Sequence, residues 1–156
     1  MLLIIAVSGH AQKKMDRTLR LLNAESVPYI QVTDARDKDG VLFMDTRKKS
    51  EYDISHLEDA IWVGYEDFDP QQLKDHEIDL STPIVVYCSI GVRSEDIGEK
   101  LQALGYTNVS NLYGGIFAWK NSGLPVFDAE GTQTDKVHAY NRFWGRFLTE
   151  GEKVYE

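Results

Sequence analysis

The chemistry that this chain could perform centres on its one cysteine, Cys88. Cys88 begins the string Cys-Ser-Ile-Gly-Val-Arg-Ser, so that Arg93 and Ser94 follow it closely. A nearby cation and the unpaired N–H groups at the start of a helix both favour a thiolate, and they lower a pKa that is about 8.5 in free cysteine. The thiolate is the nucleophilic form, so the string predicts nucleophilic chemistry at Cys88.

The residues after Cys88 are suited to hold an anion. Gly91 allows a tight curl of the backbone in which successive N–H groups point at the sulfur, and Ser94 is a favoured N-cap residue. A lone cysteine is more often an inert buried residue, so the prediction depends on these neighbours. The predicted catalytic residue is Cys88, and the predicted substrate-binding residues are Ser89, Ile90, Gly91, Val92, Arg93 and Ser94.

Hydrophobic patterns place this loop between a strand and a helix. Residues 84–87 form a continuous apolar run, which is typical of a strand buried on both faces. Residues 94–104 have helical spacing and end at Gly105. In an open α/β sheet, ligands bind at the carboxyl ends of strands, which is where Cys88 would lie.

The rest of the chain alternates between the same two patterns. We expect further strands at residues 29–32, 41–44, 60–63 and 108–112, and helices at residues 13–24 and 116–121. This alternation predicts an α/β fold with a mostly parallel sheet covered on both faces.

The last part of the chain has an apolar stripe after a polar linker at residues 128–133. The stripe predicts an amphipathic helix from about residue 134, which either packs on the chain's own core or contacts a partner, such as a second copy in a homodimer. Its members are Val137, Tyr140, Trp144, Phe147 and Leu148.

Composition argues against some classes of partner. Seventeen basic and 25 acidic residues give a net charge of −8, which repels nucleic-acid backbones and anionic lipid surfaces. An acidic stretch at residues 66–79 is interpreted as a solvated face. The apolar residues 1–7 are too few for a membrane-spanning helix, and both an export signal and a buried first strand remain open. The compartment, cytoplasmic or exported to a periplasm, is therefore open.

Several ordered motifs resemble the rhodanese family. Residues 87–94 are similar to the active-site loop of rhodanese domains, in which a cysteine opens the cradle. The string at residues 42–47, followed by Glu51-Tyr52 and Ser55-His56-Leu57, is similar to the family's Asp-x-Arg and Gly-His-Ile signatures. Residues 104–106, 112–115, 118–119 and 123–126 match its closing pattern.

The resemblance implies a rhodanese-like three-layer α/β/α domain at residues 26–127, with a central, mostly parallel five-stranded sheet. Residues 1–25 would form an N-terminal segment with a helix, and residues 128–156 a linker and the C-terminal helix.

The implied activity is sulfur transfer without a cofactor or metal. Cys88 would take a sulfane sulfur from a donor such as thiosulfate and pass it from a persulfide to a thiol or cyanide. Some thiosulfate-using members carry a basic residue where Ser89 or Ile90 stands, so a small persulfide or a protein could be the donor here. Ser55 and Asp59 replace glycines that are usual in the histidine-bearing turn, where His56 is expected to be structural.

Asp45 and Arg47 are expected to support the site from the rim of the crevice. Arg93 could orient an anionic donor or pair with Asp45, and Arg47 with Glu51 is expected to be a local ion pair.

Two rival functions are weighed against sulfur transfer. One is a non-catalytic rhodanese-like module for protein binding or sulfur relay. The other is a cysteine phosphatase or arsenate reductase, whose loops place five residues between cysteine and arginine. Only four residues separate Cys88 from Arg93, so the cradle would fit phosphate poorly.

Overall fold

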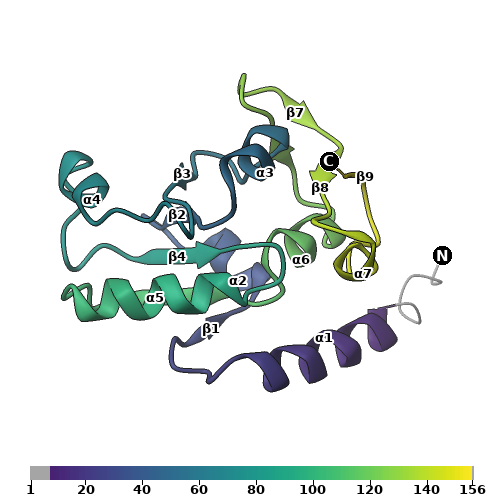
Figure 1. The fold of residues 1–156 in the computed structure, drawn as a ribbon, viewed down its shortest axis with the longest axis horizontal. Coiled ribbons are helices and arrows are strands. Elements are labelled where there is room, and N and C mark those ends of the chain that lie inside the picture. Colours follow the sequence, from purple (N-terminus) through teal and green to yellow (C-terminus); the bar gives the residue numbers. More distant parts are fainter. Residues whose placement is uncertain (1–7, 156) are drawn as a thin grey trace.

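A five-stranded parallel sheet forms the centre of the computed structural model, which describes residues 8–155 (Figure 1). Its strand order is β1-β5-β4-β2-β3, and every neighbouring pair is parallel. The register pairs Asp45 with Tyr87, so β2 and β4 end side by side. The strands are β1 Tyr29–Ile30, β2 Leu42–Asp45, β3 Ile61–Trp62, β4 Ile84–Tyr87 and β5 Val109–Leu112.

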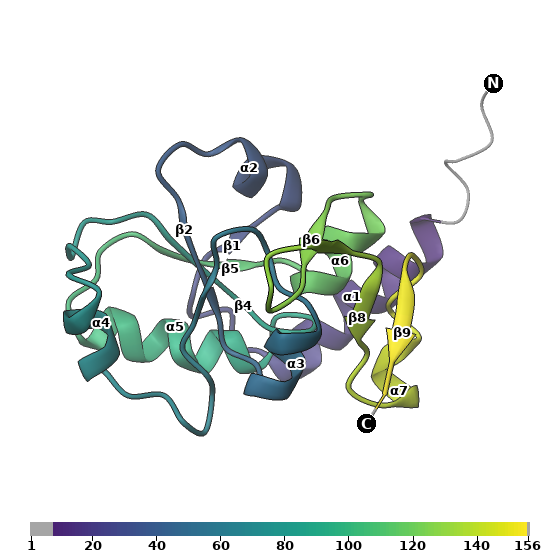
Figure 2. The same cartoon turned by 90° about the horizontal axis from the view of Figure 1, so that it is seen from above.

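Side chains on the two faces of β4 enter two separate cores. Val85 and Tyr87 join the cluster that includes residues of α2 and α6, whereas Ile84 and Val86 join the cluster that includes residues of α4 and α5. Helices therefore cover both faces, and Figure 2 shows α2 and α5 on opposite sides of the sheet. The helices are α1 Ser8–Leu22, α2 Val32–Asp37, α3 Lys49–Ile54, α4 Gln71–Asp75, α5 Arg93–Ala103 and α6 Gly115–Asn121.

The three-layer α/β/α fold is thus confirmed, with small changes at element boundaries. The expected helix at residues 13–24 is α1, and the expected strands all occur. The first strand is shorter than expected, because Val32 begins α2 and buries its side chain together with Ala35. The segment between β1 and β2 therefore contains a helix. The acidic residues of the stretch at 66–79 are exposed, as expected for a solvated face, while Leu73 within it is buried.

The prediction of a C-terminal amphipathic helix is wrong. The segment from residue 126 onward forms β6 Val126–Phe127 with β7 Gln133–Thr134, and β8 Lys136–His138 with β9 Glu152–Val154. Only the short α7, Arg142–Gly145, is helical. Tyr140 has a φ of 65° and Asn141 is extended, so a continuous helix is broken there. Pairing of β8 with β9 outweighs the helical spacing of the apolar residues in this segment.

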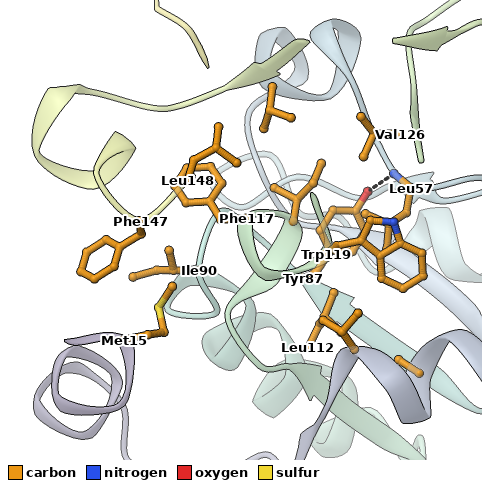
Figure 3. Close-up of a cluster of buried hydrophobic side chains, with 14 of the residues drawn as sticks. Met15, Leu57, Tyr87, Ile90, Leu112, Phe117, Trp119, Val126, Phe147 and Leu148 are labelled. Carbon is orange, nitrogen blue, oxygen red and sulfur yellow. Dashed lines mark hydrogen bonds between the residues drawn. The ribbon is translucent and has the colours of Figure 1, made fainter. Parts of the chain in front are cut away.

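Three members of the expected stripe nevertheless pack on the chain's own core. Val137, Phe147 and Leu148 are buried, and Figure 3 shows Phe147 and Leu148 near Phe117 of α6. The C-terminal segment is therefore part of the fold. A homodimer through it stays a prediction.

The remaining expectations concern a membrane-spanning helix and the apolar residues at the start of the chain. Within residues 8–155, no helix is both long and apolar enough to cross a membrane. The apolar start, for which an export signal and a first strand were both open, lies outside the described residues.

Replacing a buried residue of the C-terminal segment should destabilise the whole domain. We expect Leu148→Ala to lower the free energy of unfolding by about 2–5 kcal/mol, because it leaves a cavity against α6. Leu21→Ala is the matched control, since Leu21 is 75% exposed and its loss should change stability by less than about 0.5 kcal/mol. Denaturant unfolding followed by circular dichroism measures both, and equal effects would contradict the packing described.

Candidate active site

Cys88 lies directly after β4, at the carboxyl end of the sheet, as predicted. Cys88 is 1% exposed, yet it lines a pocket of about 170 Å³. The sulfur is therefore shielded from bulk water but faces a space that a small molecule can enter. The pocket is lined by Cys88, Ser89, Ile90, Val92, Arg93, Tyr140 and Trp144.

Gly91 gives the loop its curl. Its φ of 110° is in a region that favours glycine, and its N–H donates to Cys88 Sγ at 3.1 Å. Its carbonyl accepts hydrogen bonds of 2.8 Å from the amides of both Asn111 and Asn23. Residues from β5 and from the end of α1 thus hold the conformation that points an N–H group at the sulfur.

The start of α6 holds the other side of the loop. Ile116 N–H donates to the Cys88 carbonyl at 3.0 Å, and Phe117 N–H donates to the Ser89 carbonyl at 3.2 Å. Gly115 makes this approach possible, because a Cβ there would lie 2.3 Å from the Cys88 carbonyl oxygen. The unpaired N–H groups of a helix start are therefore used to fix the loop.

Ser94 does not cap α5, contrary to the expectation. The N-cap is Val92 and the helix begins at Arg93, so Ser94 is already in the first turn and is fully buried. Its hydroxyl lies 2.7 Å from Asn111 Oδ1 and 3.6 Å from Cys88 Sγ. Ser94 therefore contacts the sulfur directly, because the helix begins two residues earlier than a serine cap would require.

The environment lowers the pKa of the Cys88 thiol below its ordinary value. Burial by itself raises this pKa, but the positive charge of Arg93 and hydrogen bonds from Ser94 and Gly91 outweigh it. The arrangement can thus stabilise a negative charge on sulfur, as the sequence predicted.

Arg93 pairs with Glu51 and not with Asp45. Its two terminal nitrogens lie 2.8 and 2.9 Å from the two carboxylate oxygens of Glu51, and Nη2 also donates to Ser89 Oγ at 3.1 Å. Burial raises the pKa of Glu51, but its contacts with Arg93 and Arg47 produce a net decrease. The charged Glu51 sits in α3 and is fully buried, so it fixes Arg93 beside the loop.

Asp45 and Arg47 form a buried ion pair, not part of a crevice rim. Both side chains have no exposed surface, and Arg47 Nη2 lies 2.6 Å from Asp45 Oδ2. The same nitrogen donates to the Ser55 carbonyl at 2.6 Å, and Trp62 Nε1 donates to the Arg47 carbonyl at 2.8 Å. Arg47 therefore bonds to Asp45 where the sequence suggested Glu51, because the chain turns inward after β2. The pair does not line the pocket, and its support of the site stays a prediction.

His56 has the structural role that we expected. Its Nδ1 lies 3.0 Å from the Tyr52 carbonyl oxygen, and its ring stacks on the Tyr52 ring at 3.9 Å. Its backbone exchanges hydrogen bonds with Phe127. These contacts hold the turn although Ser55 and Asp59 replace the glycines, and Asp59 itself adopts a φ of 55°.

Sequence reasoning missed five residues that surround the loop. Glu51 was considered only as a partner of Arg47, and Tyr140 and Trp144 were assigned to the face of a helix. The two asparagines carried no recognisable pattern. These residues are Asn23, Glu51, Asn111, Tyr140 and Trp144. Across residues 8–155, no cluster of three His, Cys, Asp or Glu side chains is placed to bind a metal.

Removing one partner of the buried pair should destabilise the fold strongly. We expect Asp45→Ala to cost about 3–5 kcal/mol of stability, because it leaves the Arg47 charge buried without its carboxylate. The matched control is Lys49→Ala, which breaks the exposed pair with Asp53 and should cost less than about 1 kcal/mol. Denaturant titration compares the two, and a small cost for Asp45→Ala would show that the pair is dispensable.

The chain is similar in sequence to two proteins that carry different names. It is 32% identical over 91 residues to the uncharacterized protein slr1261 of Synechocystis, covering 58% of this chain and 49% of that protein. It is 38% identical over 86 residues to tRNA uridine(34) hydroxylase of Streptococcus thermophilus, covering 53% of this chain and 26% of that one. The chain thus spans half or less of the length of these relatives.

Solved structures share the fold. The rhodanese-like domain of the Alr3790 protein from Anabaena has a TM-score of 0.58 at 24% identity, covering 65% of this chain and 79% of that one. Thiosulfate sulfurtransferase from Pseudomonas aeruginosa has a TM-score of 0.60 at 17% identity, covering 86% and 26%. The model of the rhodanese-like domain matches residues 30–122, which is more than half of the chain and includes the whole Cys88 loop. The chain therefore belongs to the rhodanese-like domain family.

Proposed function

We propose that this protein is a sulfurtransferase that carries a sulfane sulfur as a persulfide on Cys88. The observation that carries this proposal is the convergence of the Gly91 N–H, Ser94 and the Arg93 charge on one sulfur that faces a small pocket. Such groups favour a thiolate before the reaction and an anionic persulfide after it.

The reaction divides into two nucleophilic displacements. The Cys88 thiolate attacks the outer sulfur of the donor, a new S–S bond forms, and the donor's S–S bond breaks. With thiosulfate, sulfite leaves with the electron pair. A thiol or cyanide then attacks the outer sulfur of the persulfide and regenerates the thiolate. The intermediate makes one difficult transfer into two easier ones, and neither needs a general base.

Contacts of Arg93 bear on the choice of donor. Both terminal nitrogens of Arg93 are engaged by Glu51, so the guanidinium is largely committed within the protein. Arg93 therefore lowers the pKa of the thiol and orders the loop, and it is less available to bind the sulfonate group of a donor. This supports thiosulfate as a usable but poor donor, compared with a small persulfide or a persulfidated protein.

A mass measurement tests the proposal directly. We expect the native protein, treated with thiosulfate or with glutathione persulfide, to gain the mass of one sulfur atom and to lose it on reduction. Cys88→Ser, which keeps the size of the side chain, should gain none. Intact-mass spectrometry reads both.

Two other results are informative. A native chain that gains no sulfur from either small donor would contradict the enzymatic proposal. If it then took up sulfur only from a persulfidated protein, the relay function considered at the outset would replace it.

Rhodanese-like relatives named tRNA uridine(34) hydroxylases favour a second candidate, a part in RNA hydroxylation. The shared region is about a quarter of those proteins, and the net charge of −8 opposes contact with an RNA backbone. Binding of tRNA at physiological salt, together with hydroxylated uridine in the recovered tRNA, would favour this candidate over sulfur transfer.

Neutralising Arg93 should shift the pH dependence of Cys88 upward. Arg93 lowers the pKa of the thiol, so Arg93→Gln raises it, and the thiolate then forms only at higher pH. We expect the midpoint of the rate of alkylation by iodoacetamide against pH to move to higher pH. Arg36→Gln is the control, because Arg36 is exposed and pairs with Asp37 away from the pocket. A midpoint that stays unchanged in Arg93→Gln would contradict the role of its charge.

A further inference from the structure

We infer that Tyr140 and Trp144 form an aromatic wall that makes the Cys88 pocket prefer sulfur donors carrying a flat apolar group to donors with a small group in the same place. This inference rests on the proposed sulfur transfer and specifies its substrate class.

The wall comes from the C-terminal segment and not from the matched domain. The family match ends at residue 122, whereas Tyr140 and Trp144 follow β8 and line the pocket together with residues of the Cys88 loop. Figure 1 shows α7, β8 and β9 beside α6 at one end of the molecule. The pocket is therefore completed by residues that this chain adds to the domain.

Tyr140 has an unfavourable backbone conformation that its neighbours enforce. Its φ of 65° is unfavourable for a large side chain and persists only where the surroundings enforce it. Tyr140 N–H donates to His138 Nδ1 at 3.1 Å, and Asn141 N–H donates to the Ala139 carbonyl at 2.8 Å. The Arg93 guanidinium carbon lies 5.1 Å from the centre of the Tyr140 ring. The tyrosine is thus directed to the edge of the loop, where it is 42% exposed.

Trp144 is fixed by the fold around it. Asn141 Oδ1 accepts a 3.0 Å hydrogen bond from Trp144 N–H, which caps α7. The Trp144 ring centre lies 6.2 Å from that of Phe147, with 28° between the planes, and Phe147 is buried in the core. A rigid aromatic surface therefore faces the pocket without further ordering when a ligand enters.

The chemistry of the pocket fits an apolar group next to the reacting sulfur. Ile90 and Val92 add aliphatic surface to the two aromatic rings. Among the described residues of the lining, Arg93 is the one cation, and Glu51 already binds both of its terminal nitrogens. The volume of about 170 Å³ is comparable to an apolar protein cavity of about 150 Å³ that accepts benzene.

Thiosulfonates allow the donor group to be varied while the reaction stays the same. In R–SO₂–S⁻, the Cys88 thiolate forms a bond to the outer sulfur, the S–S bond breaks, and the sulfinate R–SO₂⁻ leaves with the electron pair. Cyanide then takes the outer sulfur as thiocyanate. Atoms and electrons balance without an added oxidant or reductant. Benzenethiosulfonate carries an aryl group, methanethiosulfonate a methyl group, and thiosulfate a charged oxygen in the same place.

The test compares kcat/KM for benzenethiosulfonate with kcat/KM for methanethiosulfonate in each variant. The ratio within one variant removes any change in folding or general reactivity. Relative to the native protein, we expect Tyr140→Asn and Trp144→Ala each to lower the ratio by about tenfold, the usual size of a lost apolar contact in a specificity pocket. Asparagine is chosen because it tolerates the left-handed conformation of residue 140.

Two further variants serve as controls. Tyr140→Phe retains the ring and should restore the native ratio, which separates aromatic contact from hydrogen bonding by the hydroxyl. Leu104 follows α5, is 43% exposed and is not part of the pocket lining, so Leu104→Ala should keep the native ratio.

The outcomes distinguish failure of the aromatic wall from failure of the proposed sulfur transfer. An unchanged ratio in both Tyr140→Asn and Trp144→Ala, with turnover retained, would overturn the aromatic wall and leave sulfur transfer intact. If glutathione persulfide but none of the three donors places sulfur on Cys88 of the native protein, this inference fails and sulfur transfer stands. If glutathione persulfide fails as well, both fail.

Discussion

The site depends on making a negative charge less costly on a sulfur that is almost fully removed from water. Burial disfavours a thiolate, so the cost must be met by fixed dipoles and a nearby cation. Here the N–H of Gly91, the first turn of α5 and the guanidinium of Arg93 supply them. None of these groups can move far without exposing the charge to an apolar surrounding, so the loop has to be rigid.

Rigidity comes from groups that bind the loop's own backbone. Asn111 and Asn23 bind the Gly91 carbonyl, and α6 donates its first N–H groups to the carbonyls of Cys88 and Ser89. Glu51 of α3 fixes Arg93. The buried pair of Asp45 and Arg47 secures the turn after β2. The N–H groups that tune the sulfur are thus separate from those that hold the loop. In the proposed reaction, this separation lets the cradle keep its shape while sulfur is added and removed.

The C-terminal segment connects stability to the pocket. Its residues Val137 and Leu148 are buried in the core shared with α6, while Tyr140 and Trp144 reach the pocket. Packing of the first pair positions the second, because Tyr140 takes its strained conformation from the neighbouring strand β8. The same short segment therefore contributes to folding and, in our inference, to the choice of donor.

Local sequence patterns were enough to predict the parallel α/β architecture, the strand–loop–helix setting of Cys88 and the curl at Gly91, because these follow from the spacing of apolar residues and from glycine's backbone freedom. The partners of the charged residues were decided only by tertiary structure. Arg93 binds Glu51, 42 residues away, and Arg47 turns inward to Asp45. The C-terminal stripe had helical spacing, yet strand pairing between β8 and β9 prevailed, because contacts distant in sequence contribute more than local propensity.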